Sequence, residues 1–352
     1  MHITMLMPNL PPIVCGVADH GIMLGEALGR RGAEVSYLGL RGGTGSSAVS
    51  EMELWDGSTN GLEAALRELS SDFLWVQYSG YGFSRRGIPI SLVRALEGMR
   101  KRRTDLRIVV CMHETHASSA GLKWRTPLIQ PLQIFTGKRT AQAAHILFAT
   151  VETNLVRCVR EYGVPAQRVT LLPIASNIPG VAVAPDERLA FRKQLGLPEN
   201  ARIAVIFGTW ATQERTLRLF REDLKRSLGN AQLDHVLAIG GDQNSSRKEA
   251  LIALAKQFDK HLTVRGPASR EDIGRTLGCC NVGLVPTPLD YLRKSGVVAA
   301  FSAAKLELWQ KNEGAGVTFL RDVEPFPSWG QVADTAISRL LAYTNGRESV
   351  SS

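Results

Sequence analysis

Short apolar runs alternate with helix-like segments along most of this 352-residue chain. His2–Met7, Phe73–Tyr78 and Arg107–Met112 are apolar enough to be buried strands. Gly21–Arg31 and Ile90–Arg102 carry apolar residues at helical spacing. Because strands alternating with helices pair in parallel, with helices covering both faces, we predict an α/β fold built on a parallel sheet.

A second series of strands and helices follows a stretch that holds four prolines, Pro173–Pro198. Its first members are a strand at Arg202–Phe207, a helix at Thr216–Leu228 and a strand at His235–Ile239. A chain of this length exceeds one ordinary core. We therefore predict two doubly wound domains, with the chain crossing between them near Pro173–Pro185.

The predicted domain limits are 1–175 and 176–329, with an interdomain cleft as the ligand position that is usual in such folds. A last helix at Val332–Tyr343, within about 330–345, is expected to pack back on the first domain.

Composition and charge exclude several classes of protein. The net charge of +9 is divided almost evenly, +5 in residues 1–175 and +4 in 176–352, whereas nucleic-acid binding favours a clustered basic face. The five cysteines include no Cys-x-x-Cys pair, which argues against a zinc ribbon or a disulfide framework. No apolar run approaches the roughly 20 residues that cross a bilayer. We expect a cytoplasmic protein without a nucleic-acid partner.

A basic turn precedes a helix-prone run late in the chain. The strand ending at Pro286 is followed by a loop with Arg293, Lys294, Ser295 and Gly296 at its far end, and Val297–Ala304 then begins a helix. Backbone N–H groups at a helix start attract anions, and two cations, a hydroxyl and a glycine would complete a seat for a diphosphate. The alternative is a solvated basic turn before a core helix.

Several motifs of the chain resemble those of GT-B glycosyltransferases of the glycosyltransferase family 4 type, in order from residue 1 to about 305. Pro11–His20 is similar to the first glycine loop of that family, and Val109–Glu114 to the strand that ends in a His-Glu pair. His235–Asp242 resembles the second strand and glycine turn of the donor domain. The stretch from Val264–Pro267 through Gly283–Pro286 resembles the part of the family sequence that leads into the nucleotide site.

The resemblance implies a transferase that moves a sugar from a nucleotide-diphosphate sugar, with retention, in polysaccharide biosynthesis. The acceptor would be a glycan, a lipid-linked saccharide or a small molecule. His113 would touch the transferring sugar; the alternative is a histidine satisfied by neighbouring backbone. Asp19 would be the base if transfer inverts the anomeric centre.

The residues predicted to bind the donor lie in both domains. Gly16 would present N–H groups from the first domain, unless it only forms a tight turn. Arg293, Lys294 and Arg215 would hold the diphosphate because the chain has no Asp-x-Asp pair for a divalent metal. The predicted set contains no metal ligand and no tightly bound cofactor, and its donor-binding members are Gly16, Gly208, Arg215, Asp290, Arg293, Lys294, Ser295 and Gly296.

Some residues depart from the family pattern. Asp290 stands at the first of two positions that are usually glutamates, but the second is Val298, and Lys305–Trp309 lacks the usual glycine and proline. A catalytically inactive GT-B subunit that binds a partner and a GT-B sugar-nucleotide epimerase are therefore the alternative functions.

The segment Gly121–Arg139 mixes apolar and basic side chains and is expected to be broken by Pro127 and Pro131. Such a segment could contact a lipid-linked acceptor at the inner face of the membrane. A buried lid or core loop is the alternative.

Overall fold

The structure is a computed structural model that describes residues 1–13, 15–42, 52–68, 70–116, 126–242, 245–320 and 323–348. The chain divides into two compact units. Unit 1 comprises Met1–Ile174 together with Pro327–Ser352, and unit 2 comprises Ala175–Phe326.

Unit 1 is built on a parallel sheet whose strand order is β3-β2-β1-β4-β5-β6-β7. Met5 of β1 lies opposite Tyr37 of β2 on one side and Trp75 of β4 on the other. The strand order runs outward in one direction from β1 to β3 and in the other from β4 to β7, so the switch point, where ligands bind in such folds, lies between β1 and β4. The strands are β1 (His2–Met7), β2 (Glu34–Gly39), β3 (Met52–Leu54), β4 (Phe73–Tyr78), β5 (Arg107–Met112), β6 (Ile146–Ala149) and β7 (Val169–Leu171).

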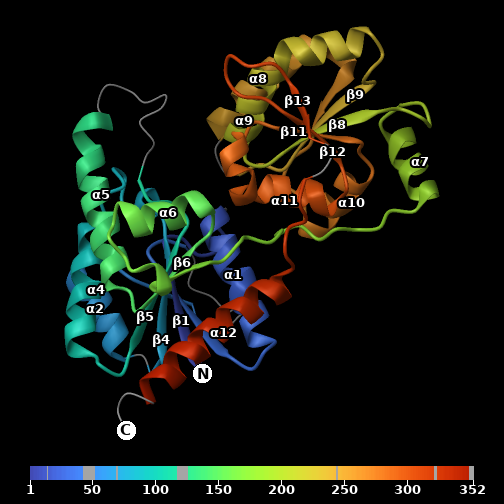
Figure 1. Cartoon of the computed structure of the whole chain (residues 1–352). Coiled ribbons are helices and arrows are strands. Elements are labelled where there is room, and N and C mark those ends of the chain that lie inside the picture. The colour runs from blue at the N-terminus through green and yellow to red at the C-terminus, as the bar shows by residue number, and fades with distance from the viewer. Residues whose placement is uncertain are drawn as a thin grey trace. The chain divides into compact units, whose positions relative to one another are not determined.

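Helices cover both faces of this sheet (Figure 1). One face packs against a core to which α2, α4, α5 and α6 contribute, and the other face is covered by α1, with α12 packed against α1. The helices of unit 1 are α1 (Gly16–Gly29), α2 (Thr59–Glu68), α3 (Gly80–Phe83), α4 (Ile90–Arg102), α5 (Thr126–Ala143), α6 (Glu152–Arg160), the 3-10 turn η1 (Ala166–Arg168) and α12 (Trp329–Glu348).

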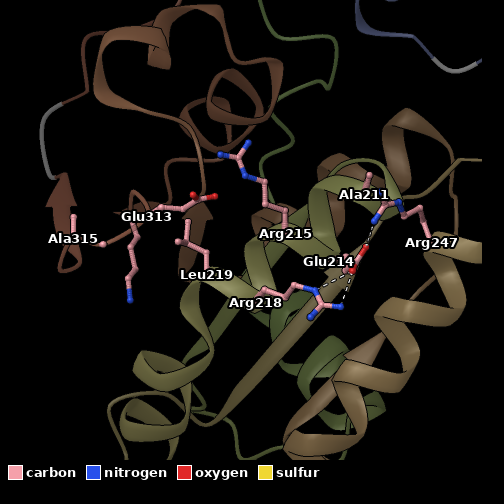
Figure 2. Close-up of a pocket in the computed structure, with 10 residues that line it drawn as sticks. Ala211, Glu214, Arg215, Arg218, Leu219, Arg247, Glu313 and Ala315 are labelled. Carbon is pink, nitrogen blue, oxygen red and sulfur yellow. Dashed lines mark hydrogen bonds and ion pairs between the residues drawn. The ribbon is translucent and has the colours of Figure 1, made fainter. Parts of the chain in front are cut away.

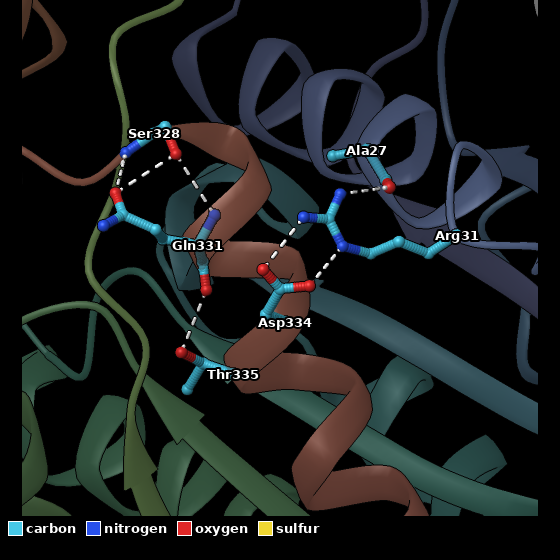
Figure 3. Close-up of polar contacts among 6 residues, drawn as sticks. All are labelled: Ala27, Arg31, Ser328, Gln331, Asp334 and Thr335. Carbon is cyan, nitrogen blue, oxygen red and sulfur yellow. Dashed lines mark hydrogen bonds and ion pairs between the residues drawn. The ribbon is translucent and has the colours of Figure 1, made fainter.

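The last helix, α12, belongs to unit 1 although most of that unit precedes residue 175. Its Asp334 carboxylate accepts two hydrogen bonds from the guanidinium of Arg31, which follows α1 (Figure 3). Arg339, further along the helix, donates to the backbone carbonyl of Gln167. The apolar side of α12 is buried, with Leu340 fully enclosed.

Unit 2 has a six-stranded sheet in the order β10-β9-β8-β11-β12-β13, parallel except for the final antiparallel pair. Its strands are β8 (Ile203–Phe207), β9 (His235–Ile239), β10 (Leu262–Val264), β11 (Val282–Val285), β12 (Glu307–Gln310) and β13 (Thr318–Leu320). Its helices are α7 (Pro185–Gln194), α8 (Trp210–Gly229), α9 (Ser245–Ala255), η2 (Lys256–His261), α10 (Arg270–Gly278), η3 (Leu289–Lys294) and α11 (Gly296–Ala303). The α/β class with two doubly wound, mainly parallel sheets is confirmed.

Two segments differ from the sequence-based expectation. The prediction that Pro127 and Pro131 break their segment is wrong, because α5 runs through both. Pro127 is the second residue of the helix, where a backbone N–H is not needed, and Pro131 removes only one intrahelical bond. The basic loop before α11 is a 3-10 helix, η3, over Leu289–Lys294. Of Gly121–Arg139, residues 121–125 lie outside the described residues.

In the part of the chain that the structure describes, no helix combines the length and the apolar character needed to cross a membrane.

The packing of α12 predicts an asymmetric response to two neighbouring substitutions. Leu340→Ala should lower the free energy of unfolding by about 2–5 kcal/mol, because it leaves a cavity at a fully buried position. Leu341→Ala, at a side chain that is 50% exposed, should change it by less than about 0.5 kcal/mol. Urea titration followed by circular dichroism measures both values. Equal losses for the two variants would contradict the docking of α12 on unit 1.

Candidate functional site

Polar side chains gather at the carboxyl ends of the central strands of unit 1. His113 follows β5 directly and is 5% exposed. Its Nε2 lies 2.8 Å from Oε1 of Gln77, a fully buried residue near the end of β4. The His113 backbone is also fixed, since its N–H donates to the Tyr78 carbonyl and its own carbonyl accepts from Asn154. Gln77 thus sets the orientation of the imidazole and, by accepting at its amide oxygen, places a proton on Nε2.

A second histidine packs against His113. The ring of His20, in α1, meets the His113 ring edge-on at 4.6 Å between centroids, and the Trp329 ring of α12 lies 5.2 Å from His20. Neither ring nitrogen of His20 has a hydrogen-bond partner among the described residues. Burial lowers the pKa of His20 to about 4. The Gln77 side chain lies nearby and acts in the opposite direction, toward a higher pKa. His20 is therefore neutral at pH 7.

The first turn of α1 contains the other two predicted residues of this unit. Gly16 is its first residue and is exposed, and Asp19 is half-buried one turn on. The residue before the helix, Cys15, makes no hydrogen bond from its side chain to the first turn of α1, which also contains the carboxylate of Asp19. A Cβ at Gly16 would meet no described atom within 4 Å, so packing alone does not explain the glycine.

In unit 2, Gly208 forms the turn between β8 and α8. Its φ of +131° is a backbone conformation that favours glycine. The Gly208 carbonyl accepts from the Gln213 side chain at 2.7 Å, and a Cβ on Gly240, in the turn after β9, would lie 2.7 Å from the same oxygen. The two turns therefore pack so closely that both positions need glycine.

Arg215, on α8, lines a cavity of about 740 Å³. Figure 2 shows that cavity with Arg218 and Arg247 bound to Glu214, each at 2.9 Å. Burial favours the neutral carboxyl of Glu214, but the hydrogen bonds from both guanidinium groups outweigh it and lower its pKa. The cavity is lined by Ala211, Glu214, Arg215, Arg218, Leu219, Arg247, Lys311, Glu313, Gly314 and Ala315.

Arg215 differs from the other basic residues of this cavity, whose charges are balanced by ion pairs. Lys311 forms an ion pair with Asp223, and Arg218 and Arg247 share Glu214. Arg215 is exposed and forms no ion pair with a described residue. It is therefore the lining cation best able to accept an anionic group from solution.

The basic turn of unit 2 is engaged in contacts of its own. Arg293 donates through Nη1 to the carbonyls of Glu324 and Pro325, at 2.7 and 3.2 Å, and its guanidinium lies 4.8 Å from the centre of the Phe326 ring. Ser295 caps α11 by accepting from the Val298 N–H. These contacts give Arg293 and Ser295 structural roles that the sequence did not indicate.

The other members of the turn differ in exposure. Asp290 is exposed, and Lys294 and Gly296 are half-buried. A Cβ at Gly296 would meet only the Asn177 side chain, at 3.8 Å. None of the turn residues is among the described residues that line the cavity at Arg215.

Sequence reasoning missed Gln77 and Trp329, the two residues that hold the histidine pair. Gln77 carried a usable signal, because it is the one strongly polar residue in the apolar run Phe73–Tyr78. Trp329 carried none, since its contact depends on how α12 returns to unit 1.

Comparison with known proteins identifies the fold. No family model matches the sequence, and no curated protein is significantly similar to it. Among solved structures, sucrose-phosphate synthase from Thermosynechococcus elongatus matches with a TM-score of 0.62 at 15% identity, over 100% of this chain and 94% of its own. HepE from Anabaena, in complex with UDP, matches with a TM-score of 0.58 at 11% identity, over 88% and 80%.

The UDP-GlcNAc 2-epimerase from Methanocaldococcus jannaschii is also similar, with a TM-score of 0.53 at 11% identity over 97% of this chain and 100% of its own. At such low identity these likenesses establish the GT-B fold, with two Rossmann-like domains, and leave the reaction to be argued from the residues.

The buried His20 predicts a loss of stability in acid. Because its folded-state pKa of about 4 lies below the value of 6.5 for a free imidazole, the unfolded chain takes up a proton first as the pH falls. The stability that the neutral ring provides is complete above pH 6.5. It should be lost from there toward pH 4, by up to about 1.4 kcal/mol per pH unit.

The measurement is urea unfolding of wild type and His20→Phe at pH 7.5, 6 and 5. Phenylalanine keeps the ring contacts and cannot titrate, so the variant should show the shallower dependence. Identical slopes for the two proteins would rule out His20 as a source of the acid sensitivity.

Proposed function

We propose that the protein is a glycosyltransferase of the family 4 type, which moves a sugar from a nucleotide-diphosphate sugar to a glycan, a lipid-linked saccharide or a small molecule. The observation that carries this proposal is the position of His113. It is a buried imidazole, oriented by the Gln77 amide, at the carboxyl end of β5, in a fold that the chain has in common with sugar-nucleotide enzymes.

The donor would be held by its phosphates. Transfer breaks the bond between the anomeric carbon and the diphosphate oxygen, and the bonding electrons leave with the diphosphate. The leaving group therefore gains charge, which nearby cations stabilise. We assign this role to Arg215, Arg293 and Lys294 rather than to a metal, because the chain has no Asp-x-Asp pair. The N–H groups of the first turn of α1, which begins at Gly16, would supply further donors.

The acceptor hydroxyl would form the new bond to the anomeric carbon. For a retaining transfer, an oxygen of the leaving phosphate takes the proton from that hydroxyl, and no protein nucleophile is needed. His113, held by Gln77, would bind a sugar hydroxyl as transfer proceeds. Asp19 is the residue available as a base if the reaction inverts.

A sugar-nucleotide epimerase is the second candidate, because an epimerase that acts on UDP-GlcNAc is among the similar structures. Such an enzyme would convert one sugar nucleotide into another without any acceptor. A catalytically inactive GT-B subunit that binds a partner is suggested by Val298 at the second glutamate position, and such a subunit would turn over no sugar nucleotide.

A donor screen separates these functions. The purified protein, incubated with UDP, GDP, ADP and TDP sugars, should release the nucleoside diphosphate from one of them. His113→Ala should lower that rate by about 10²–10³-fold, the usual loss when a transition-state hydrogen bond is removed. Anion-exchange chromatography of the products measures it.

Leu341→Ala, at an exposed position of α12, is the control and should keep the wild-type rate. Recovery of an epimerised sugar nucleotide with no released diphosphate would replace the proposal with the epimerase. If the protein turns over none of the donors, the proposal is replaced by the inactive subunit.

The three cations predict a phosphate-dependent loss of affinity. Arg215→Ala or Lys294→Ala should each weaken binding of the nucleotide sugar by about 1.5–3 kcal/mol, a roughly ten- to hundredfold rise in Kd. Binding of the free nucleoside should be unchanged, because it has no phosphate. Isothermal titration calorimetry gives both constants.

Arg293 needs a paired design because it also binds the backbone near Phe326. Arg293→Ala removes both charge and contact, whereas Phe326→Leu removes only the stacking partner. If the arginine binds phosphate, only the first variant should lose affinity. Arg226→Ala is the control: this arginine is on α8, as Arg215 is, and it is largely exposed, so its removal should leave the affinity for the nucleotide sugar unchanged. Equal losses for Arg293→Ala and Phe326→Leu would mean that Arg293 is structural.

A cytoplasmic location, with contact at the inner face of the membrane, belongs to the same proposal. It is motivated by the basic and apolar character of Gly121–Arg139.

A further inference from the structure

Three arginines of unit 1 lie at the amino ends of its strands, the end of the sheet opposite to His113. Arg100 is in the last turn of α4, which precedes β5, Arg168 directly precedes β7, and Arg339 is on α12. The Arg339 guanidinium donates to the carbonyl of Gln167, the neighbour of Arg168, so α12 reaches the same place. We call these three arginines the arginine cluster.

Two members of the cluster share one acceptor. The backbone carbonyl of Ala144 accepts a hydrogen bond from Arg100 at 3.3 Å and another from Arg168. Arg100 also donates to the Gln142 carbonyl at 2.6 Å. Burial lowers the pKa of Arg168, and the nearby charge of Arg100 lowers it further. The arrangement therefore concentrates positive charge on an oxygen that carries no full charge of its own.

The charge of the arginine cluster is not balanced by a carboxylate in the part of the chain that the structure describes. The neighbouring Arg102 and Arg103 pair with Glu63 and Asp105. The three cluster arginines donate only to backbone carbonyls. An anion from solution is therefore the group that would neutralise them.

The surroundings of the cluster offer no acid, and one of its donors lacks a partner. Aspartate and glutamate are absent from the segments that contribute to it, 142–147, 163–172 and 336–347. The Nε of Arg339 is buried and has no hydrogen-bond partner among the described residues. Because a buried N–H without an acceptor is costly, a bound anion that reaches this guanidinium would be stabilising.

Two further polar side chains border the cluster. Tyr343, one turn after Arg339 on α12, lies near enough to Arg168 to act on its pKa. The Tyr343 ring is 6.1 Å from the ring of His145, which accepts at Nδ1 from the Ile108 N–H and therefore carries its proton on Nε2. Hydrogen-bond donors thus surround the point where α4, η1 and α12 meet.

We propose that the arginine cluster binds a small molecule that carries a diphosphate group. Guanidinium groups match phosphate oxygens in pairs, and a phosphate between Arg100 and Arg168 would remove their mutual repulsion. A second phosphate on the same ligand would extend the contact to Arg339. An extended polyanion would need a longer basic surface, which the ion pairs of Arg102 and Arg103 interrupt.

Such a ligand would hold α4, η1 and α12 together and so fix the last helix on unit 1. The cluster is separate from the cations assigned to the donor, which all belong to unit 2. The inference therefore goes beyond the proposed reaction and does not depend on it.

Hydrogen exchange of the full chain, followed by mass spectrometry with pyrophosphate as the probe, tests the proposal. At ten times its Kd, pyrophosphate should slow the exchange of the α12 amides by roughly tenfold, because the helix undocks only from the free protein. Inorganic phosphate should bind at least tenfold more weakly, because it reaches fewer of the arginines. Sodium chloride at the same ionic strength should leave α12 exchange nearly unchanged.

Arg100→Gln, Arg168→Gln and Arg339→Gln should each raise the Kd for pyrophosphate at this site by about ten- to hundredfold. Arg339→Lys keeps the charge and should retain part of the slowing. Arg94→Gln, at an exposed position of α4, is the matched control and should behave like wild type. Circular dichroism confirms that each variant is folded.

Arg215→Ala separates this site from the donor site, because it should leave the slowing of α12 exchange intact. The proposal is overturned if pyrophosphate does not slow α12 exchange in wild type, if chloride slows it equally, or if the three glutamine variants keep the slowing. It is also overturned if Arg215→Ala abolishes the slowing. Since the readout is exchange at α12 and not turnover, a negative result here is distinct from a failure of the proposed function.

Discussion

A parallel sheet with helices on both faces leaves polar side chains only one place to meet a ligand, the ends of its strands. In this protein His113 and Gly208 directly follow strands, and Gly16 and Asp19 lie in the first turn of the helix that comes after β1. Gln77 shows the constraint at its strictest. It is a polar side chain inside a fully buried strand, and its amide oxygen is used by His113 at the end of the neighbouring strand. The orientation of His113 is therefore set by the neighbouring strand of the sheet.

The sequence was a good guide wherever burial alone determines structure. Phe73–Tyr78, Ile90–Arg102 and Arg107–Met112 were predicted at the limits that the structure has, because their apolar residues are set by the sheet and its cover. Helix beginnings were predicted too late, as for α1 and α8, since a polar or glycine-rich first turn carries no apolar periodicity. The continuous α5 was missed because tertiary packing outweighs the local cost of a proline.

The candidate site was harder to predict for a physical reason. The residue type fixes the chemistry of a side chain, but its contacts in the folded protein decide whether that side chain is available to bind a ligand. Arg293 and Arg215 looked alike as cations in the sequence, yet the structure gives Arg293 two carbonyls and an aromatic ring and leaves Arg215 on an open cavity. The contact of Trp329 with His20 joins residues more than 300 positions apart, and no local pattern encodes such a pairing.

The return of α12 to unit 1 has a consequence for how the protein is made. The face of the sheet under α1 receives its last helix only after the whole of Ala175–Phe326 has been synthesised. At the usual elongation rates of 5–20 residues per second, roughly 150 residues take about 8–30 s. During that interval the nascent first unit exposes the apolar surface that Val332, Ala336 and Leu340 later cover. The time on the ribosome, and the chaperones that meet the chain there, thus become part of the folding problem that this topology sets.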